Sequence, residues 1–219
     1  MSNSILITGG AGFIGLHLAR KLVSNGYKVD LVDNLARGIR DEDLETLLSQ
    51  TSVSFTQLDL TDQKSTMVLG SGYHAIYHLA GIVGVKHVLN RPYEVMDTNI
   101  RMLQNVITLA KRQSSLNRLL FASTSEVYAG TLEKYGLEIP TVEESNIVVS
   151  SLNRPRTSYM LSKIVGEVMC QHCGVPFTIF RPHNIYGPRM GMAHVIPELL
   201  RRVWDIQSPQ PLEVYSVDH

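Results

Sequence analysis

Two residues that could transfer a proton lie one helical turn apart in the second half of the sequence. Tyr159 and Lys163 are four positions apart in a helix-period segment expected to span Ser158–His172, so both side chains project from one face. A lysine ammonium beside a phenol favours the phenolate and lowers the pKa of the phenol. The pair could therefore take a hydroxyl proton while hydride leaves the same carbon. On its own, Tyr-x-x-x-Lys is equally well explained by an exposed helical pair.

Hydroxyl groups and one carboxylate gather at the end of a predicted strand upstream of this pair. The strand Arg118–Ser123 is followed by Thr124, Ser125 and Glu126. Ligands of open α/β sheets bind beyond the carboxyl ends of the strands, where a hydroxyl can hydrogen-bond the oxygen that is being oxidised. A carboxylate two residues further on can reach a neighbouring carbon. We therefore predict that this cluster acts together with the Tyr-Lys pair.

A glycine-rich loop near the N-terminus has the spacing of a dinucleotide-binding turn. The segment Thr8–Gly15 reads Thr-Gly-Gly-Ala-Gly-Phe-Ile-Gly, follows a predicted strand and opens a predicted amphipathic helix. Gly9 permits the tight turn, Gly12 lets backbone N–H groups approach a pyrophosphate, and Gly15 allows close helix–strand packing. The N-terminus of the helix then presents its positive end to the phosphates.

An acidic residue at the end of the second predicted strand indicates which dinucleotide binds. Asp33 stands where a carboxylate can accept hydrogen bonds from the ribose hydroxyls of an adenosine. A carboxylate repels a 2′-phosphate, so the sequence favours NAD over NADP. Arg37, a few residues further on, could serve a phosphate instead, and a structural turn with an incidental aspartate is the remaining alternative.

Apolar runs rich in β-branched residues alternate with helix-period segments along the chain. Near-continuous apolar strands indicate that both faces of a sheet are buried, and the alternation indicates right-handed crossovers. The sequence therefore predicts an α/β fold, a Rossmann-type doubly wound parallel sheet with helices on both faces. Strands are predicted over Ile5–Thr8, Lys28–Asp33, Val53–Asp59, Ala75–Ala80, Arg118–Ser123 and Pro176–Arg181. Helices are predicted over Ile14–Asn25, Asp41–Ser49, Asp62–Leu69, Pro92–Arg112, Ser158–His172 and Val195–Trp204.

Two domains are expected from this pattern. Residues 1–182 would form an NAD-binding domain that carries the catalytic residues, and residues 183–219 would begin a substrate-binding part. The segment Pro211–Ser216 has the pattern of a strand start that nothing completes, so we expect the second domain to be truncated.

Composition and cysteine usage exclude several classes of function. The formal net charge is zero, so the sequence predicts no nucleic-acid partner and no binding to an anionic membrane. The chain has no apolar run of membrane-spanning length and no room before its first strand for a signal peptide, so we expect a cytoplasmic protein. Cys170 and Cys173 could form a redox pair or metal site, but two thiols cannot complete a structural zinc site. We expect ordinary side chains and no metal.

Taken together, the motifs resemble those of the extended short-chain dehydrogenase/reductase family, in its NAD-dependent epimerase/dehydratase branch. The resemblance covers essentially the whole chain. In order, the motifs are Thr8–Gly15, Asp59-Leu60, His78–Gly81, Asn99, Ser123–Tyr128, Tyr159 with Lys163, and Arg181–Arg189.

The resemblance implies which residues hold the cofactor and the substrate. The adenosine diphosphate half of NAD would be held by Gly9, Gly12, Phe13, Ile14, Gly15, Asp33 and Asn34. Adenine would be flanked by Asp59 and Leu60, and the path to nicotinamide would be lined by Leu79, Ala80, Gly81, Tyr159 and Lys163. Asn184 would help to bind the pyrophosphate of a sugar nucleotide.

The resemblance also implies the chemistry. Thr124, Tyr159 and Lys163 would be a catalytic triad, with Ser125 and Glu126 beside them. Members of this branch oxidise the C4 hydroxyl of the sugar and then epimerise, dehydrate or decarboxylate the ketone. A homodimer would form through the helices Pro92–Arg112 and Ser158–His172, although their apolar faces could equally cover the sheet.

Glu126 discriminates among these reactions. A carboxylate here resembles 4,6-dehydratases and UDP-glucuronate decarboxylases, whereas many 4-epimerases carry a small or neutral residue. Ser125-Glu126 differs from the Asp-Glu of most dTDP-glucose dehydratases, and Tyr128-Ala129 replaces the usual Tyr-Gly. Our preferred hypothesis is a 4,6-dehydratase or a UDP-glucuronate decarboxylase type of enzyme. The alternatives are a UDP-sugar 4-epimerase and a non-catalytic NAD-binding module.

Three polar positions have structural explanations that we prefer to functional ones. His78 lies on an apolar strand and is expected to be a core histidine with a hydrogen-bond partner. Asn99 is expected to brace a neighbouring loop. Lys86 and His87 are expected in a solvated loop, with contact to the cofactor as the alternative.

Overall fold

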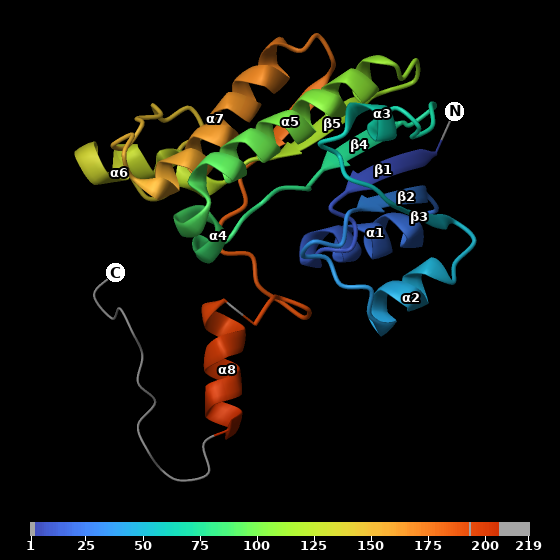
Figure 1. Cartoon of the computed structure of the whole chain (residues 1–219), viewed down its shortest axis with the longest axis horizontal. Coiled ribbons are helices and arrows are strands. Elements are labelled where there is room, and N and C mark those ends of the chain that lie inside the picture. The colour runs from blue at the N-terminus through green and yellow to red at the C-terminus, as the bar shows by residue number, and fades with distance from the viewer. Residues whose placement is uncertain (1–2, 193, 206–219) are drawn as a thin grey trace. The chain divides into compact units, whose positions relative to one another are not determined.

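The computed structural model describes residues 3–192 and 194–205, and the chain divides into two compact units, Met1–His183 and Asn184–His219 (Figure 1). The two units are described separately. The strand expected over Pro211–Ser216 lies outside the described residues.

The first unit is built on a six-stranded parallel sheet with the order β3-β2-β1-β4-β5-β6. Thr8 at the end of β1 lies opposite Val32 on one side and His78 on the other, so the strand order reverses between β1 and β4. The bounds are β1 Ser4–Thr8, β2 Lys28–Asp33, β3 Val53–Gln57, β4 Ala75–His78, β5 Arg118–Ala122 and β6 Phe177–Phe180. The predicted strands are confirmed, several of them ending one or two residues earlier than expected.

Helices cover both faces of this sheet, which confirms the doubly wound fold (Figure 1). One face carries α1 (Phe13–Ser24) and α2 (Glu42–Leu48), whose apolar residues pack with those of β1 and β2. The other face carries α5 (Pro92–Lys111) and α7 (Pro155–His172), which lie side by side. The short helix α3 (Gln63–Thr66) contacts α5.

Each face has its own hydrophobic cluster. Leu16, Leu31 and Leu44 are completely buried between the sheet and the pair α1 and α2. Leu103 and Cys170 belong to the cluster beneath α5 and α7. Because the buried strands are covered on both faces, the loops at their carboxyl ends are fixed to a rigid frame.

Two short helices and one helix start differ from the prediction. The segment that includes Lys86 and His87 is not a loop but α4 (Val85–Asn90), which is too short to show a helical period. A 3-10 turn, η1 (Ser125–Tyr128), leads into α6 (Ala129–Tyr135). Helix α7 begins at Pro155 rather than Ser158, because proline in the first turn lacks only an N–H that has no helical partner there.

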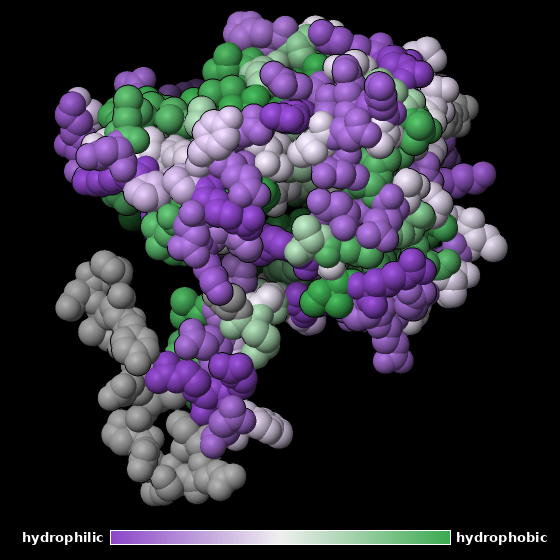
Figure 2. Space-filling view, in the orientation of Figure 1, coloured by the Kyte–Doolittle hydropathy of each residue, from purple (hydrophilic) through white to green (hydrophobic). Residues whose placement is uncertain are grey.

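The second unit contains α8 (Val195–Asp205), as predicted within one residue. Its hydrophobic side chains form one stripe and are exposed, among them Leu200, Val203 and Trp204. On the face in Figure 2, hydrophilic and hydrophobic residues are interspersed. Among the described helices, none combines the length and the apolar character needed to span a bilayer.

Candidate active site

The glycine loop joins β1 to α1 as the sequence predicts. Gly9 has a φ of +72°, and a Cβ placed there would stand 2.8 Å from the backbone nitrogen of Ala80. A Cβ at Gly15 would collide with the carbonyl of Gly9, so helix and turn touch through bare backbone. Gly12 caps α1, and the first N–H groups of the helix, at Phe13 and Ile14, have no acceptor within the helix. The loop therefore has the form of an anion cradle.

The Asp33 carboxylate lies at the end of β2 beside this loop. One oxygen accepts a hydrogen bond from the N–H of Ala11 at 3.1 Å and the other accepts from the N–H of Leu35 at 2.8 Å. A carboxylate at the end of this strand is an acceptor for the hydroxyls of an adenosine ribose. Asn34 is exposed and accepts from the N–H of Ala36 at 3.0 Å.

Arg37 extends away from Asp33 and reaches the loop after β4. Its guanidinium donates to the carbonyl of Val83 at 3.0 Å. It also lies near enough to Tyr159 to lower the pKa of that phenol.

The segment after β4 is hydrogen-bonded to the end of β1, whereas the segment after β3 has one exposed and one buried side chain. The Asp59 side chain is exposed and accepts two hydrogen bonds from Thr61, whereas the Leu60 side chain is buried in the core. Leu79 and Ala80 donate their N–H groups to Thr8, at 3.2 and 3.3 Å. The contact of Asp59 and Leu60 with adenine stays a prediction.

Helix α7 and strand β5 bring the predicted catalytic residues together. The Thr124 hydroxyl follows β5, accepts from the N–H of Glu126 at 3.2 Å, and hydrogen-bonds the Tyr159 phenol. Lys163 is 5 % exposed, and its Nζ donates to the carbonyl of Ala122 at 2.8 Å. The same Nζ stands 5.9 Å from the centre of the Tyr159 ring. The strand end and the helix face therefore meet as the motifs predict.

The pKa of Tyr159 shifts in the direction opposite to the expected one. Burial raises the pKa of the phenol to about 12, the charge of Glu126 adds to that effect, and Thr124 and Arg37 oppose it. Burial lowers the pKa of Lys163 to about 8. The expectation that a nearby ammonium lowers the phenol pKa is wrong for this state of the site, because desolvation dominates and the ammonium is directed to a backbone carbonyl.

Ser125 and Glu126 point to different partners. The Ser125 hydroxyl hydrogen-bonds Nδ1 of His183 at 2.7 Å, beyond the end of β6. Glu126 forms an ion pair with Arg156, whose Nη2 lies 3.1 Å from Oε1. Glu126 is thus the carboxylate that faces the Tyr159 helix.

A buried polar network lies behind the predicted catalytic residues. The Ser123 hydroxyl donates to Oε1 of Glu167 at 2.5 Å, and Arg181 binds both oxygens of the same carboxylate, at 2.9 and 2.7 Å. Arg181 also contacts the Tyr128 hydroxyl and donates to the carbonyl of Glu143 at 2.8 Å. The network ties the ends of β5 and β6 to α7.

The structural explanations preferred for His78 and Asn99 are confirmed. His78 is 2 % exposed and hydrogen-bonds the Thr8 hydroxyl at 2.8 Å, and burial lowers its pKa to about 3. Asn99 braces the loop after β4: its Oδ1 accepts from the N–H of Ile82 at 2.7 Å and its Nδ2 donates to Ser162 at 3.3 Å. A Cβ at Gly81 would stand 3.5 Å from both Asn99 Oδ1 and Lys163 Nζ.

The remaining predicted positions are Asn184, which belongs to the second unit, and the two cysteines. Asn184 opens the second unit with a φ of 47°, so its role at a pyrophosphate stays a prediction. Cys170 and Cys173 are buried side chains of the core, where burial raises the pKa of Cys170 to about 12.

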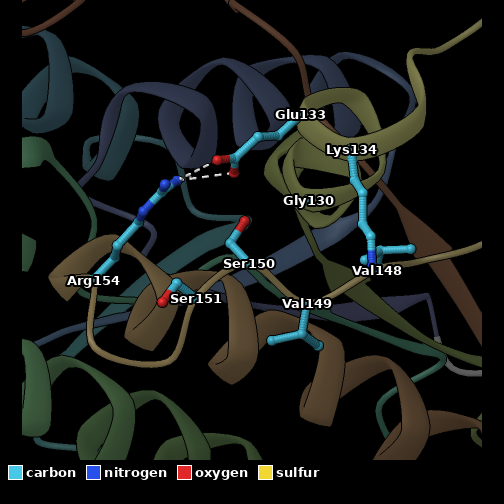
Figure 3. A pocket seen from close by; sticks show the side chains of 8 residues that line it. All are labelled: Gly130, Glu133, Lys134, Val148, Val149, Ser150, Ser151 and Arg154. Carbon is cyan, nitrogen blue, oxygen red and sulfur yellow. Dashed lines mark hydrogen bonds and ion pairs between the residues drawn. The ribbon is translucent and has the colours of Figure 1, made fainter.

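A pocket of about 300 Å³ lies between α6 and the segment that leads into α7 (Figure 3). None of the predicted site residues lines it. Arg154 and Glu133 face each other across it and form an ion pair at 2.8 Å. The adjacent Gly130 touches the carbonyl of Val148 so closely that no side chain fits, which accounts for a glycine one position after the usual Tyr-Gly.

Sequence reasoning missed Arg156 and the network around Glu167. Arg156 precedes the predicted start of its helix, so it was not assigned to the face of Tyr159; Pro155, which favours the first turn, was the available signal. Glu167 and Arg181 lie 14 residues apart in the sequence, and only the fold shows that they pair.

Comparisons with known proteins agree with this geometry. A profile of the NAD dependent epimerase/dehydratase family matches residues 5–216. The UDP-N-acetyl-alpha-D-glucosaminuronate decarboxylase of Bacillus cytotoxicus is 35 % identical over 92 % of this chain and 61 % of its own length. Two solved structures superpose over 92 % of this chain: a UDP-galactose 4-epimerase (31 % identity, TM-score 0.73, 62 % of its chain) and an NAD-dependent NDP-hexosamine 5,6-dehydratase of tunicamycin biosynthesis (28 %, 0.72, 61 %).

The chain thus spans about three fifths of the length of these three relatives. The match to the family profile covers nearly all of its 219 residues. The chain belongs to the NAD dependent epimerase/dehydratase family.

Proposed function

We propose that the chain forms the cofactor-binding and catalytic part of an enzyme that modifies a sugar nucleotide by transient oxidation at C4. The preferred reactions are those of a 4,6-dehydratase or a UDP-glucuronate decarboxylase. The observation that carries this proposal is the convergence of Thr124 and Glu126 from the end of β5 with Tyr159 and Lys163 from α7. The decarboxylase relative supports it.

The cofactor is NAD, as in the family to which the chain belongs. The bare backbone at Gly9 and Gly15, the start of α1 and the Asp33 carboxylate fit a dinucleotide diphosphate with an unmodified adenosine ribose. When bound, NAD would supply the acceptor for the hydride that leaves C4 of the sugar.

Two residues of the chain would bind the C4 hydroxyl and remove its proton. Thr124 would hydrogen-bond the C4 oxygen, and Tyr159 would take its proton. The pKa of Tyr159, about 12 in this structure, must fall for that transfer, and a positive charge close to the phenol has this effect. The guanidinium of Arg37 is one such charge, since it lowers the pKa of this phenol.

Glu126 distinguishes the proposed reactions from simple epimerisation. A carboxylate beside C5 and C6 is useful when those atoms react, either in removal of the C5 proton and loss of the C6 hydroxyl or in loss of a C6 carboxylate as carbon dioxide. The similarity to a UDP-galactose 4-epimerase keeps the epimerase as the second candidate.

The reaction is tested by incubating the full-length protein with UDP-, dTDP- and GDP-sugars and resolving the products by mass. Loss of water identifies a dehydratase, and loss of carbon dioxide identifies a decarboxylase. An unchanged mass with inverted C4 contradicts the preferred reactions and establishes the epimerase.

The base is tested with Tyr159→Phe, which keeps the ring and removes the hydroxyl. We expect a fall in hydride transfer of roughly 10²- to 10⁴-fold, with NAD affinity unchanged. Turnover equal to the wild type would refute the assignment of Tyr159. NAD binding without turnover in the wild type would instead favour a non-catalytic NAD-binding module.

A homodimer and a cytoplasmic location remain proposals. The apolar side of α5 packs on the sheet, with Leu103 and Val106 in the core cluster, so a dimer would use the outward sides of α5 and α7. Light scattering on the purified protein measures the oligomeric state.

A further inference from the structure

One cationic side chain shares the catalytic face of α7. Arg156 precedes Tyr159 by three residues and Lys163 by seven, and residues at these spacings line one side of a helix. Arg156 therefore stands one turn before the proposed base, on the side that faces η1 and the residues after β5.

The guanidinium of Arg156 already holds a carboxylate. Its partner is Glu126, at 3.1 Å, and the two side chains are 58 % and 37 % exposed. This is the one hydrogen bond that Arg156 makes among the described residues, and a guanidinium has five N–H donors. A pair as exposed as this contributes little to stability. Replacing Glu126 on the guanidinium by the carboxylate of a ligand therefore costs little free energy.

The nearest comparable arginine is placed differently. Arg154, two residues earlier, pairs with Glu133 across the pocket beside α6 (Figure 3). It contacts none of the predicted catalytic residues. Each arginine thus binds one glutamate, but only Arg156 does so on the face of α7 that carries Tyr159. Arg154 can therefore serve as a control for Arg156.

We propose that Arg156 recognises a carboxylate at C6 of the sugar and so selects uronic-acid sugar nucleotides. This inference rests on the proposed function, in which Tyr159 meets the C4 oxygen and Glu126 stands beside C5 and C6. In the substrate complex the C6 carboxylate takes the place of Glu126 on the guanidinium, which can bind it through two N–H groups. Glu126 is then released towards the sugar ring.

The inference is tested with UDP-glucuronate and UDP-glucose, which differ only in a carboxylate or a hydroxymethyl group at C6. With the full-length protein, Arg156→Met should raise KM for UDP-glucuronate roughly 10- to 100-fold, as expected for a lost hydrogen bond between charged groups. The Kd for UDP-glucose, measured by calorimetry, should change less than about threefold. Arg156→Lys, which keeps the charge, should restore part of the loss.

Arg154→Met is the matched control, because it removes the same group from the same turn of the chain. It should leave the KM for UDP-glucuronate and the Kd for both sugar nucleotides unchanged. In Arg156→Met, an equal rise in the Kd for UDP-glucuronate and for UDP-glucose would mean that Arg156 binds the shared diphosphate, and that result overturns the inference. An unchanged KM for UDP-glucuronate would overturn it as well.

The two proposals fail in different ways. A wild-type enzyme that converts UDP-glucose and rejects UDP-glucuronate overturns carboxylate recognition and leaves the sugar-nucleotide function standing. A wild-type enzyme that converts no sugar nucleotide overturns the proposed function, and the inference falls with it.

Discussion

Two arginine–glutamate pairs flank the proposed catalytic residues, and they differ in exposure and in the number of hydrogen bonds that join them. Arg181 and Glu167 are 20 % and 4 % exposed and are joined by two hydrogen bonds, whereas Arg156 and Glu126 are 58 % and 37 % exposed and share one. The buried carboxylate also accepts from the Ser123 hydroxyl.

This difference in exposure indicates different roles for the two pairs: Arg181–Glu167 supports the fold, whereas Arg156–Glu126 is available to bind a ligand. A buried carboxylate such as that of Glu167 cannot give up its arginine without leaving a buried charge unpaired, which is costly. The Arg181–Glu167 pair therefore fixes the ends of β5 and β6 against α7. The exposed pair is free of that restraint, since water replaces either partner.

The largest effect is expected at the buried pair. Arg181→Met leaves the carboxylate of Glu167 buried without its cation and should lower the free energy of unfolding by about 3–5 kcal/mol. Urea denaturation followed by circular dichroism measures this loss. The double variant Arg181→Met/Glu167→Leu should be less destabilised than the single one, and a loss below about 1 kcal/mol in the single variant would contradict the scaffold role.

A smaller effect concerns Lys163, which lies on α7 between the two pairs. Its pKa is about 8 in the folded protein, against 10.5 for an ordinary lysine, so between these pH values the unfolded chain binds more protons. Stability relative to Lys163→Met should therefore rise as pH increases from 8 to 10.5, by at most about 3 kcal/mol. A difference between the two proteins that stays constant over this range would show that Lys163 is not desolvated.

The smallest effect is expected at the exposed pair. Arg156→Met should change the free energy of unfolding by no more than about 1 kcal/mol, and added salt should reduce the difference further. The same denaturation experiment at low and high salt provides the measurement. A loss as large as that of Arg181→Met would remove the distinction between the two pairs.

The sequence was sufficient for the parallel sheet, the glycine loop and the Tyr-Lys face, because each depends on residues close together in the chain. Tyr159 and Lys163 need one helix to become neighbours. Glu126 and Arg156 belong to different elements, and their contact depends on where α7 begins. A helix predicted three residues short therefore hid Arg156, although Tyr159 on the same helix was found.

Gly130 and Thr131, near the start of α6, reduce the conformational entropy that the connection to α7 loses on folding. The Thr131 hydroxyl donates to the carbonyl of Asn146 at 2.5 Å and accepts from the N–H of Val148 at 3.1 Å, while Gly130 lets the Val148 carbonyl approach. These contacts divide the long connection between α6 and α7 into shorter loops. The entropy cost of closing each of these loops is smaller than that of closing one long loop. We expect a side chain at position 130 to break these contacts between α6 and residues 146–148. Ordering the first turn of α7, which carries Arg156, would then cost more conformational entropy.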